Sequence, residues 1–205
     1  MPILRRTPFA LSHRLSCAYH STASNGSKLT IGIRREDPRR IWERRCPISP
    51  DAVHELVEKE GVEVLIQDCE RRVWSTNEFV KVGFTFSFPE SVLIHDAFQA
   101  GARIHPTLSP SHITLGIKET PLHEVLTDPV PAIHEAPSQS PQIPRTHLMF
   151  SHTVKGQPYN MELLSKFLHS DPPHFGVPPR LIDYELLTGE DGKRTVGFGW
   201  YAGGE

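Results

Sequence analysis

Short apolar runs alternate with amphipathic segments along most of the chain. Runs of this kind predict strands at 29–34 (LTIGIR), 62–67 (VEVLIQ), 113–118 (ITLGIK), 147–151 (HLMFS) and 181–186 (LIDYEL). A further strand is expected at 194–198, after a turn at 188–192. Between these runs, the spacing of Val53, Leu56 and Val57 predicts a helix, and Met161, Leu164 and Phe167 predict another.

Capping residues mark where the helices begin. Ser49-Pro50-Asp51 combines a hydroxyl cap, a proline at the first helical position and an acid in the first turn, and Gly61 ends that helix. Ser75 or Thr76 followed by Glu78 predicts a second helix start, for a helix over 75–82.

Alternating strands and helices predict an α/β domain with three layers around a mostly parallel sheet. In such sheets functional groups collect just past the carboxyl ends of the strands. The residues in these positions are Arg34, Arg35, Glu36, Lys118, Glu119, His152 and Tyr184. The proline-rich stretch at 128–144 is expected to be a surface loop.

Composition narrows the possible classes of protein. The chain has 205 residues, 38% of them hydrophobic, which is enough for a packed core, and a net charge of −2. No apolar run approaches the roughly 20 residues of a membrane helix, so no membrane partner is expected. The body contains no basic block, which argues against nucleic acid as the main partner.

Metal and cysteine chemistry are not predicted. The three cysteines, Cys17, Cys46 and Cys69, match neither a disulfide framework nor a CxxC metal site. The twelve histidines include no HxxxH or HExxH placement. The chain also has no GxGxxG, so no dinucleotide fingerprint is visible.

Residues 1–28 differ from the rest of the chain. They contain no Asp or Glu, but they hold Arg5, Arg6, Arg14, Lys28 and five serines. This composition predicts a mitochondrial transit peptide, and therefore a matrix location; an ordinary disordered tail is the alternative.

Three side chains are candidates for chemistry. Lys118 and His152 each follow an apolar strand, where a lysine with a lowered pKa or a histidine could transfer protons; a solvent-exposed lysine and a capping histidine are the alternatives. Arg45 precedes the turn into the first helix and could bind a substrate carboxylate through its guanidinium, although most charges in 34–45 are expected to be solvated.

Several motifs, in this order, resemble one family. They are RRED (34–37), WERRCPISP (42–50), VLIQ (64–67), LGIKE (115–119), FSHTVKGQ (150–157) and LIDYE (181–185). Over 29–203 the chain resembles the lysine-ketoglutarate reductase part of the alpha-aminoadipic semialdehyde synthase family. This family is grouped with the saccharopine dehydrogenases, the alanine dehydrogenases and the transhydrogenases. The resemblance implies a flavodoxin-like substrate domain of the alanine dehydrogenase/transhydrogenase type.

The resemblance also implies an activity and roles for residues. Family members condense lysine with 2-oxoglutarate, and NADPH reduces the imine to saccharopine. Arg45 would bind a substrate carboxylate, while Lys118 and His152 would be the catalytic proton-transfer residues. No metal is implied.

Two departures from the family pattern modify this expectation. A nucleotide-binding domain is expected to be absent, so NADPH would not bind this chain alone and the chain would be inactive by itself. Residues 84–99 form an atypical insert, interpreted as a retained intron or a lid. The alternatives are a non-catalytic binding or association domain, and an alanine dehydrogenase or transhydrogenase fragment, which residues 42–45 disfavour.

Overall fold

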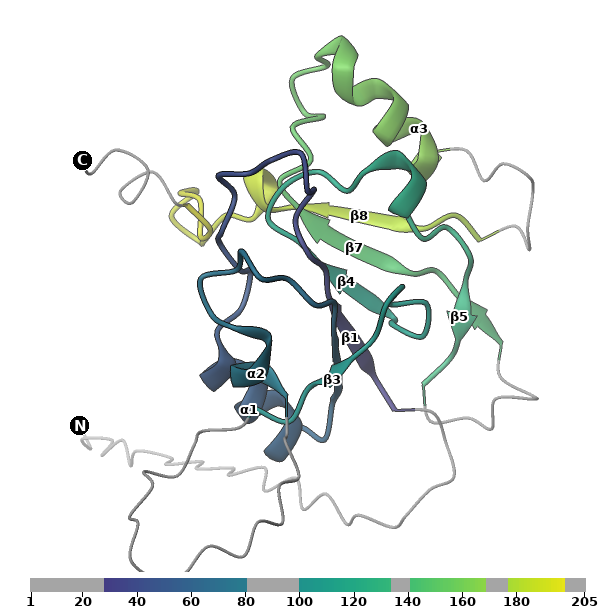
Figure 1. Cartoon of the computed structure of the whole chain (residues 1–205). Coiled ribbons are helices and arrows are strands. Elements are labelled where there is room, and N and C mark those ends of the chain that lie inside the picture. The colour runs from purple at the N-terminus through teal and green to yellow at the C-terminus, as the bar shows by residue number, and fades with distance from the viewer. Residues whose placement is uncertain (1–27, 81–99, 134–140, 169–176, 198–205) are drawn as a thin grey trace, which may run out of the picture.

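The computed structural model describes residues 28–80, 100–133, 141–168 and 177–197 (Figure 1). The predicted transit peptide, apart from Lys28, and the insert at 84–99 lie outside these residues.

A sheet of six parallel strands forms the centre of the molecule. Its strands are β1 (Thr30–Ile33), β2 (Glu63–Ile66), β3 (Arg103–Ile104), β4 (Ile113–Leu115), β7 (Thr146–Met149) and β8 (Arg180–Asp183). They lie in the order β3-β2-β1-β4-β7-β8. The predicted α/β class with a parallel sheet is confirmed. In this doubly wound order the chain reverses direction across the sheet between β1 and β4, the point where such sheets place their ligands.

Helices cover both faces of this sheet. They are α1 (Pro50–Glu58), α2 (Thr76–Phe79) and α3 (Met161–Leu168). One face of β1 and β2 contributes Ile33 and Ile66 to a core with Val53 of α1 and Phe79 of α2. On β7, Met149 packs instead against α3.

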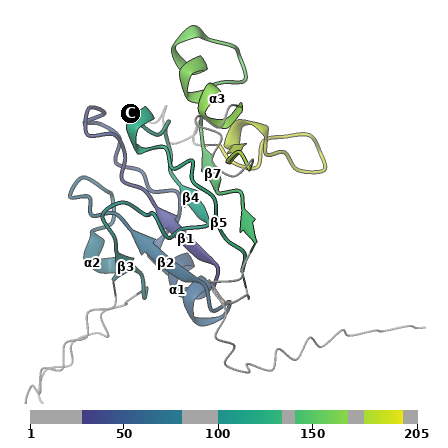
Figure 2. The same ribbon diagram turned by 90° about the vertical axis from the view of Figure 1, so that its right-hand side faces the viewer.

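Strand register places α3 on the opposite face from α1 and α2. Gly32, Thr114 and His147 are partners across β1, β4 and β7, so they share one face, and Ile33 faces the other way. His147 contacts the ring of Phe167 in α3, with centroids 5.3 Å apart. The sheet therefore lies between two layers, and Figure 2 shows α3 separated from α1 and α2.

The predicted caps form. The Ser49 hydroxyl accepts a hydrogen bond from the Ala52 N–H at 3.3 Å, and the Ser75 N–H donates to Glu78 Oε2 at 2.6 Å. These contacts satisfy N–H groups that a helix start leaves without partners.

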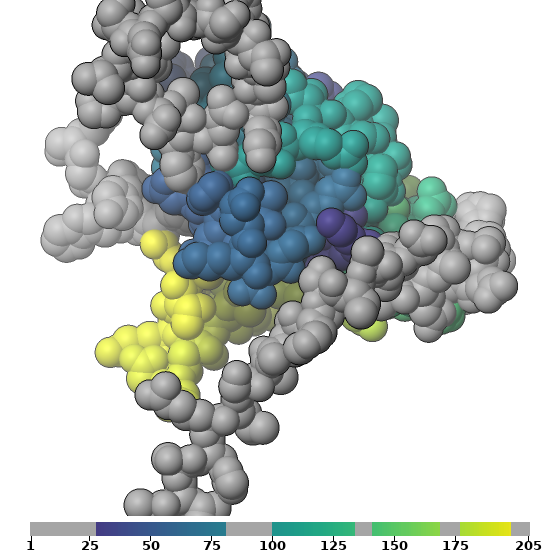
Figure 3. Space-filling model, turned by 90° about the horizontal axis from the view of Figure 1, so that it is seen from below, coloured from purple at the N-terminus to yellow at the C-terminus, as the bar shows by residue number. Residues whose placement is uncertain are grey.

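In the space-filling view the blue residues of α1 and its neighbours occupy the middle of the visible face, with teal residues beside them (Figure 3).

Some segments differ from the sequence predictions. Residues Tyr184–Leu186 form a 3-10 turn (η3) rather than the end of a strand. In the described part of the strand expected at 194–198, Arg194 forms only an isolated β-bridge, to Thr188. The expected proline-rich loop contains a small antiparallel pair, β5 (Val130–Pro131) and β6 (Gln142–Ile143). Strands of two residues, including β3, are too short to produce an alternating pattern. Two further 3-10 turns are η1 (Leu122–Glu124) and η2 (Pro158–Asn160).

Candidate functional site

A buried ion pair joins the ends of β1 and β4, where the sheet order reverses. Arg34 and Glu36 are 3% and 4% exposed, and Arg34 Nη2 lies 3.2 Å from Glu36 Oε2. Arg34 Nη2 also donates to the Lys118 carbonyl at 2.8 Å, and the Glu36 carboxylate accepts from the Ile117 and Lys118 N–H groups at 2.8 and 3.0 Å. The pair therefore fixes the backbone of the segment that holds Lys118.

Gly116 is required by this arrangement. A Cβ at this position would lie 2.6 Å from Arg34 Nη2 and 2.9 Å from Arg34 Nε. The absence of a side chain lets the guanidinium approach the end of β4 closely.

His152 follows β7 in an unusual backbone conformation and contacts Glu119. Its φ angle is 53°, in the left-handed region that residues other than glycine seldom adopt. Its Nδ1 lies 2.7 Å from Glu119 Oε1, and Glu119 Oε2 lies 2.6 Å from Arg40 Nη2. Burial alone would raise the pKa of Glu119, but hydrogen bonds from its own backbone and from His152, with the charge of Arg40, lower it. Glu119 is therefore an ionised acceptor for His152.

Buried polar contacts hold the backbone on both sides of His152. The preceding residue, Ser151, is fully buried; its hydroxyl donates to the Asp183 carboxylate, and its N–H lies 3.3 Å from Asp183 Oδ2. Asn160 Nδ2 donates to the Ser151 carbonyl at 2.8 Å and to Glu119 Oε1 at 3.4 Å. These contacts stabilise the left-handed conformation that aims the imidazole at Glu119.

Arg45 is paired with a carboxylate in its own loop. Its Nε and Nη2 donate to Glu43 at 2.8 and 2.5 Å, a bidentate arrangement. Burial would raise the pKa of Glu43, but the bonds from Arg45 and the charge of Lys118 lower it. The bond to Glu43 in turn raises the pKa of Arg45.

Two of the three predicted residues lie in a network of carboxylate contacts: Glu43 binds Arg45, and Glu119 binds His152. Lys118 precedes Glu119 in the chain, and its charge helps to lower the pKa of Glu43. Sequence reasoning noted Glu119 as a strand-end residue but gave no role to it or to Glu43. The order acid-x-Arg at 43–45 is a local signal that could have suggested the Glu43 pair.

Aromatic rings lie beside this network. Tyr184, selected as a strand-end residue, is 7% exposed, and its ring meets Phe150 edge-on with centroids 5.1 Å apart. Phe150 stacks on His152 at 6.4 Å. Burial, with the charge of Glu36, raises the pKa of Tyr184, so its hydroxyl keeps its proton.

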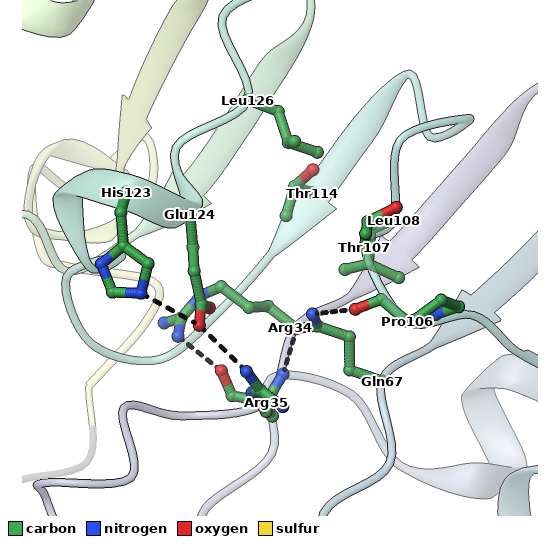
Figure 4. Close-up of a pocket in the computed structure, with 10 residues that line it drawn as sticks. All are labelled: Arg34, Arg35, Gln67, Pro106, Thr107, Leu108, Thr114, His123, Glu124 and Leu126. Atoms are coloured by element: carbon green, nitrogen blue, oxygen red, sulfur yellow. Dashed lines mark hydrogen bonds and ion pairs between the residues drawn. The ribbon is translucent and has the colours of Figure 1, made fainter.

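Two cavities open beside η1, and His123 lines both. The one of about 360 Å³ contains the Glu119 side of the network. Its lining residues include Asp37, Arg39, Arg40, Glu119, Tyr159 and Asn160. The other, of about 250 Å³, lies where the sheet order reverses and contains Arg34 and Arg35 (Figure 4).

The turn after β1 differs from a dinucleotide-binding turn. A pyrophosphate at this point of a doubly wound sheet needs a glycine-rich turn after β1. Here the Arg34–Glu36 pair follows β1, and the Arg34 guanidinium covers the nearby Gly116. Among the residues that the structure describes, no group of three or more His, Cys, Asp or Glu side chains could hold a metal ion. None of the helices in this part of the chain is long and apolar enough to cross a membrane.

Fold and site together define a doubly wound α/β domain with basic, acidic and imidazole groups at the carboxyl edge of its sheet. The chain is 30% identical over 176 residues to the alpha-aminoadipic semialdehyde synthase, mitochondrial, of Rattus norvegicus, and 31% identical over 176 residues to that of Bos taurus. It is 26% identical over 166 residues to the saccharopine dehydrogenase [NAD(+), L-lysine-forming] of Candida albicans. No family model matches the chain.

These matches confirm the resemblance inferred from the motifs. The two mammalian alignments cover 86% of this chain but only 14% of each synthase, and the Candida alignment covers 78% of this chain and 33% of that enzyme. The chain is thus homologous, over most of its length, to a small part of these proteins. It is a domain related to oxidoreductases of lysine metabolism.

Proposed function

We propose that this chain provides the substrate-binding domain of a lysine-ketoglutarate reductase, which joins lysine to 2-oxoglutarate in lysine catabolism. The observation that supports this most is the contact of ionised Glu119 with His152 Nδ1 at 2.7 Å, beside Lys118 at the carboxyl edge of the sheet. The names of the relatives supply the substrate class.

In this proposal Arg45 binds a carboxylate of 2-oxoglutarate. Its guanidinium is already engaged by Glu43, so the substrate has to share the fork with that side chain. Lys118 and His152 then move protons. One of them accepts a proton from the side-chain amine of the substrate lysine, and the amine then attacks the ketone carbon of 2-oxoglutarate. The other donates a proton to the former ketone oxygen, which leaves as water. Because ionised Glu119 accepts from His152 Nδ1, Nε2 is the nitrogen left for proton exchange.

The reduction itself needs NADPH, which supplies the hydride. We propose that a nicotinamide-binding domain contributed by other residues is the partner, because the described residues do not form a pyrophosphate cradle. The chain alone is then inactive. We further propose a mitochondrial matrix location, supported by the acid-free start and the names of the mammalian relatives.

The test combines turnover with direct binding. The chain is mixed with lysine, 2-oxoglutarate and NADPH, with and without a separately expressed nicotinamide-binding domain from the Bos taurus synthase. NADPH absorbance should fall only when both parts are present. Lys118→Met and His152→Gln should each lower kcat by about 10²–10⁴-fold, and the exposed Lys166→Met serves as the matched control. Unchanged kcat in either site variant would reject its proposed role.

The carboxylate site is tested without turnover. Arg45→Lys should weaken 2-oxoglutarate binding, measured by calorimetry, by tenfold or more, because lysine cannot bind a carboxylate bidentately. Arg44→Lys, one position earlier and exposed, is the control. Equal losses in the two variants would contradict the assignment of Arg45.

A non-catalytic association domain is the second candidate. It is favoured by the exposed Trp42 and Ile41, which are 87% and 57% accessible in the loop after β1. Saturable binding of 2-oxoglutarate that depends on Arg45 would rule against it.

A further inference from the structure

The cavity of about 250 Å³ beside β1 is distinct from the proposed catalytic network. Its walls come from five separate segments: the end of β1, the residue after β2, the β3–β4 connection, β4 itself and the region of η1. Figure 4 shows Arg34 and Arg35 on one side, Leu126 and Thr114 across from them, and Pro106 to Leu108 along the right. Lys118, His152 and Arg45 do not line it.

Hydrogen bonds join two of its walls. The Gln67 side chain accepts from the Arg35 N–H at 3.0 Å and donates to the Pro106 carbonyl at 2.8 Å, so it joins two of the segments. Leu108 is 1% exposed and has a φ angle of 57°. A buried leucine in this conformation is strained, and strain of this kind is concentrated at ligand-binding sites.

Two arginines that line the cavity each have a buried Nε–H without an acceptor among the described residues. The Arg34 side chain is 3% exposed, and the Arg35 side chain is 43% exposed although its Nε is buried. Buried donors without a partner are rare, because each one loses its hydrogen bonds to water without replacement. An oxygen acceptor bound inside the cavity would remove that cost.

The charges and shape of the cavity restrict what the acceptor can be. Glu124 lies 3.1 Å from Arg35 Nη2, and Glu36 pairs with Arg34, so a doubly charged anion would be repelled. Leu108, Leu126 and Pro106 give it an apolar side. A volume of about 250 Å³ is below the roughly 300–1,000 Å³ typical of pockets for drug-sized ligands, so the ligand is small.

We propose that this cavity binds a small monocarboxylate with an apolar tail. The carboxylate accepts from the Nε–H groups of Arg34 and Arg35, and the tail packs against Leu108 and Leu126. Hydrogen bonds between charged groups are stronger than those to a neutral acceptor, which gives the preference for a carboxylate over a neutral amide. The proposal does not rest on the proposed reductase activity, although Arg34, which lines the cavity, also donates to the Lys118 carbonyl.

The test uses 3-phenylpropanoate as the probe and 3-phenylpropanamide as its uncharged match. Each is titrated into the full chain at low ionic strength and followed by amide NMR. The acid should give saturable shifts centred on Leu108, Thr114 and Leu126, and the amide should bind at least tenfold more weakly. Equal affinity of the two probes, or shifts centred on other residues, would overturn the proposal.

Four variants locate the site. Arg35→Gln should weaken the acid at least tenfold, while Arg194→Gln, an exposed arginine that also lies near a glutamate, should change its affinity less than twofold. Leu126→Phe, which fills the cavity, should abolish binding. Arg45→Lys should leave probe affinity unchanged. Loss of binding in Arg45→Lys or Arg194→Gln equal to that in Arg35→Gln would overturn the assignment, and neither result bears on the reductase test.

Discussion

Glu119 Oε1 lies 2.7 Å from His152 Nδ1, although 33 positions separate the two residues. The contact exists because β4 and β7 are parallel neighbours, so the residues that follow them meet at one edge of the sheet. The left-handed backbone of His152 then turns the imidazole toward the carboxylate. Neither condition is sufficient alone.

The backbone of His152 leads to a first prediction. His152→Asn should be more stable than His152→Val by roughly 1–2 kcal/mol, because asparagine tolerates the left-handed region and a β-branched side chain does not. Both variants lose the imidazole, so their difference isolates the backbone term. Urea unfolding of the two proteins measures it. Equal stabilities would mean that position 152 relaxes to a different φ angle.

Gly116 should tolerate a methyl group only when Arg34 is shortened. Gly116→Ala is expected to cost roughly 1–3 kcal/mol, because the added Cβ would overlap the Arg34 guanidinium. In an Arg34→Ala background the same change should cost much less. A double-mutant cycle on the free energy of unfolding checks this. Additive effects would show that the guanidinium is not what excludes the side chain.

The buried pair beside it should be costly to break. Glu36→Gln should lower the free energy of unfolding by roughly 3–5 kcal/mol, because it leaves Arg34 buried without a counter-charge. The control is Glu55→Gln, which removes a fully exposed partner of Lys59 and should have no measurable effect. A loss for Glu36→Gln that disappears in high salt would indicate a solvent-exposed pair instead.

Acid should destabilise the fold through His147. This residue is 1% exposed, its Nε2 lies 2.8 Å from the Leu126 carbonyl, and burial lowers its pKa from 6.5 to about 4. Above pH 6.5 the His147 side chain is neutral in both the folded and the unfolded state, so it does not lower the free energy of unfolding. Between 6.5 and about 4 only the unfolded state binds the proton, so stability falls by roughly 3 kcal/mol in total.

Urea unfolding at a series of pH values measures this effect. His147→Asn should flatten the decline between pH 6.5 and 4, and the largely exposed His123→Gln should leave it unchanged. The pKa of His112 is lowered too, chiefly by burial, so a smaller decline should persist in His147→Asn. A full decline in His147→Asn would assign the acid sensitivity to other groups.

Much of the local structure can be predicted from the sequence. The apolar runs that form β1, β2, β4, β7 and β8 are long enough to show their pattern, and the caps at Ser49 and Ser75 form from neighbouring residues. The strand-end rule also selects Lys118 and His152 without knowledge of the pairing. By contrast, β3, β5 and β6 are two-residue strands, and they exist only because a partner strand is present.

The sequence alone determined the class of sheet, the positions of the helices and the set of residues at the strand ends, because these depend on interactions within about ten residues. Tertiary structure decided the strand order, the Glu119–His152 contact and the fit of Arg34 against Gly116. These contacts join segments far apart in the chain. Their geometry follows from which strands become neighbours, and that is set by packing of the whole core rather than by any local pattern.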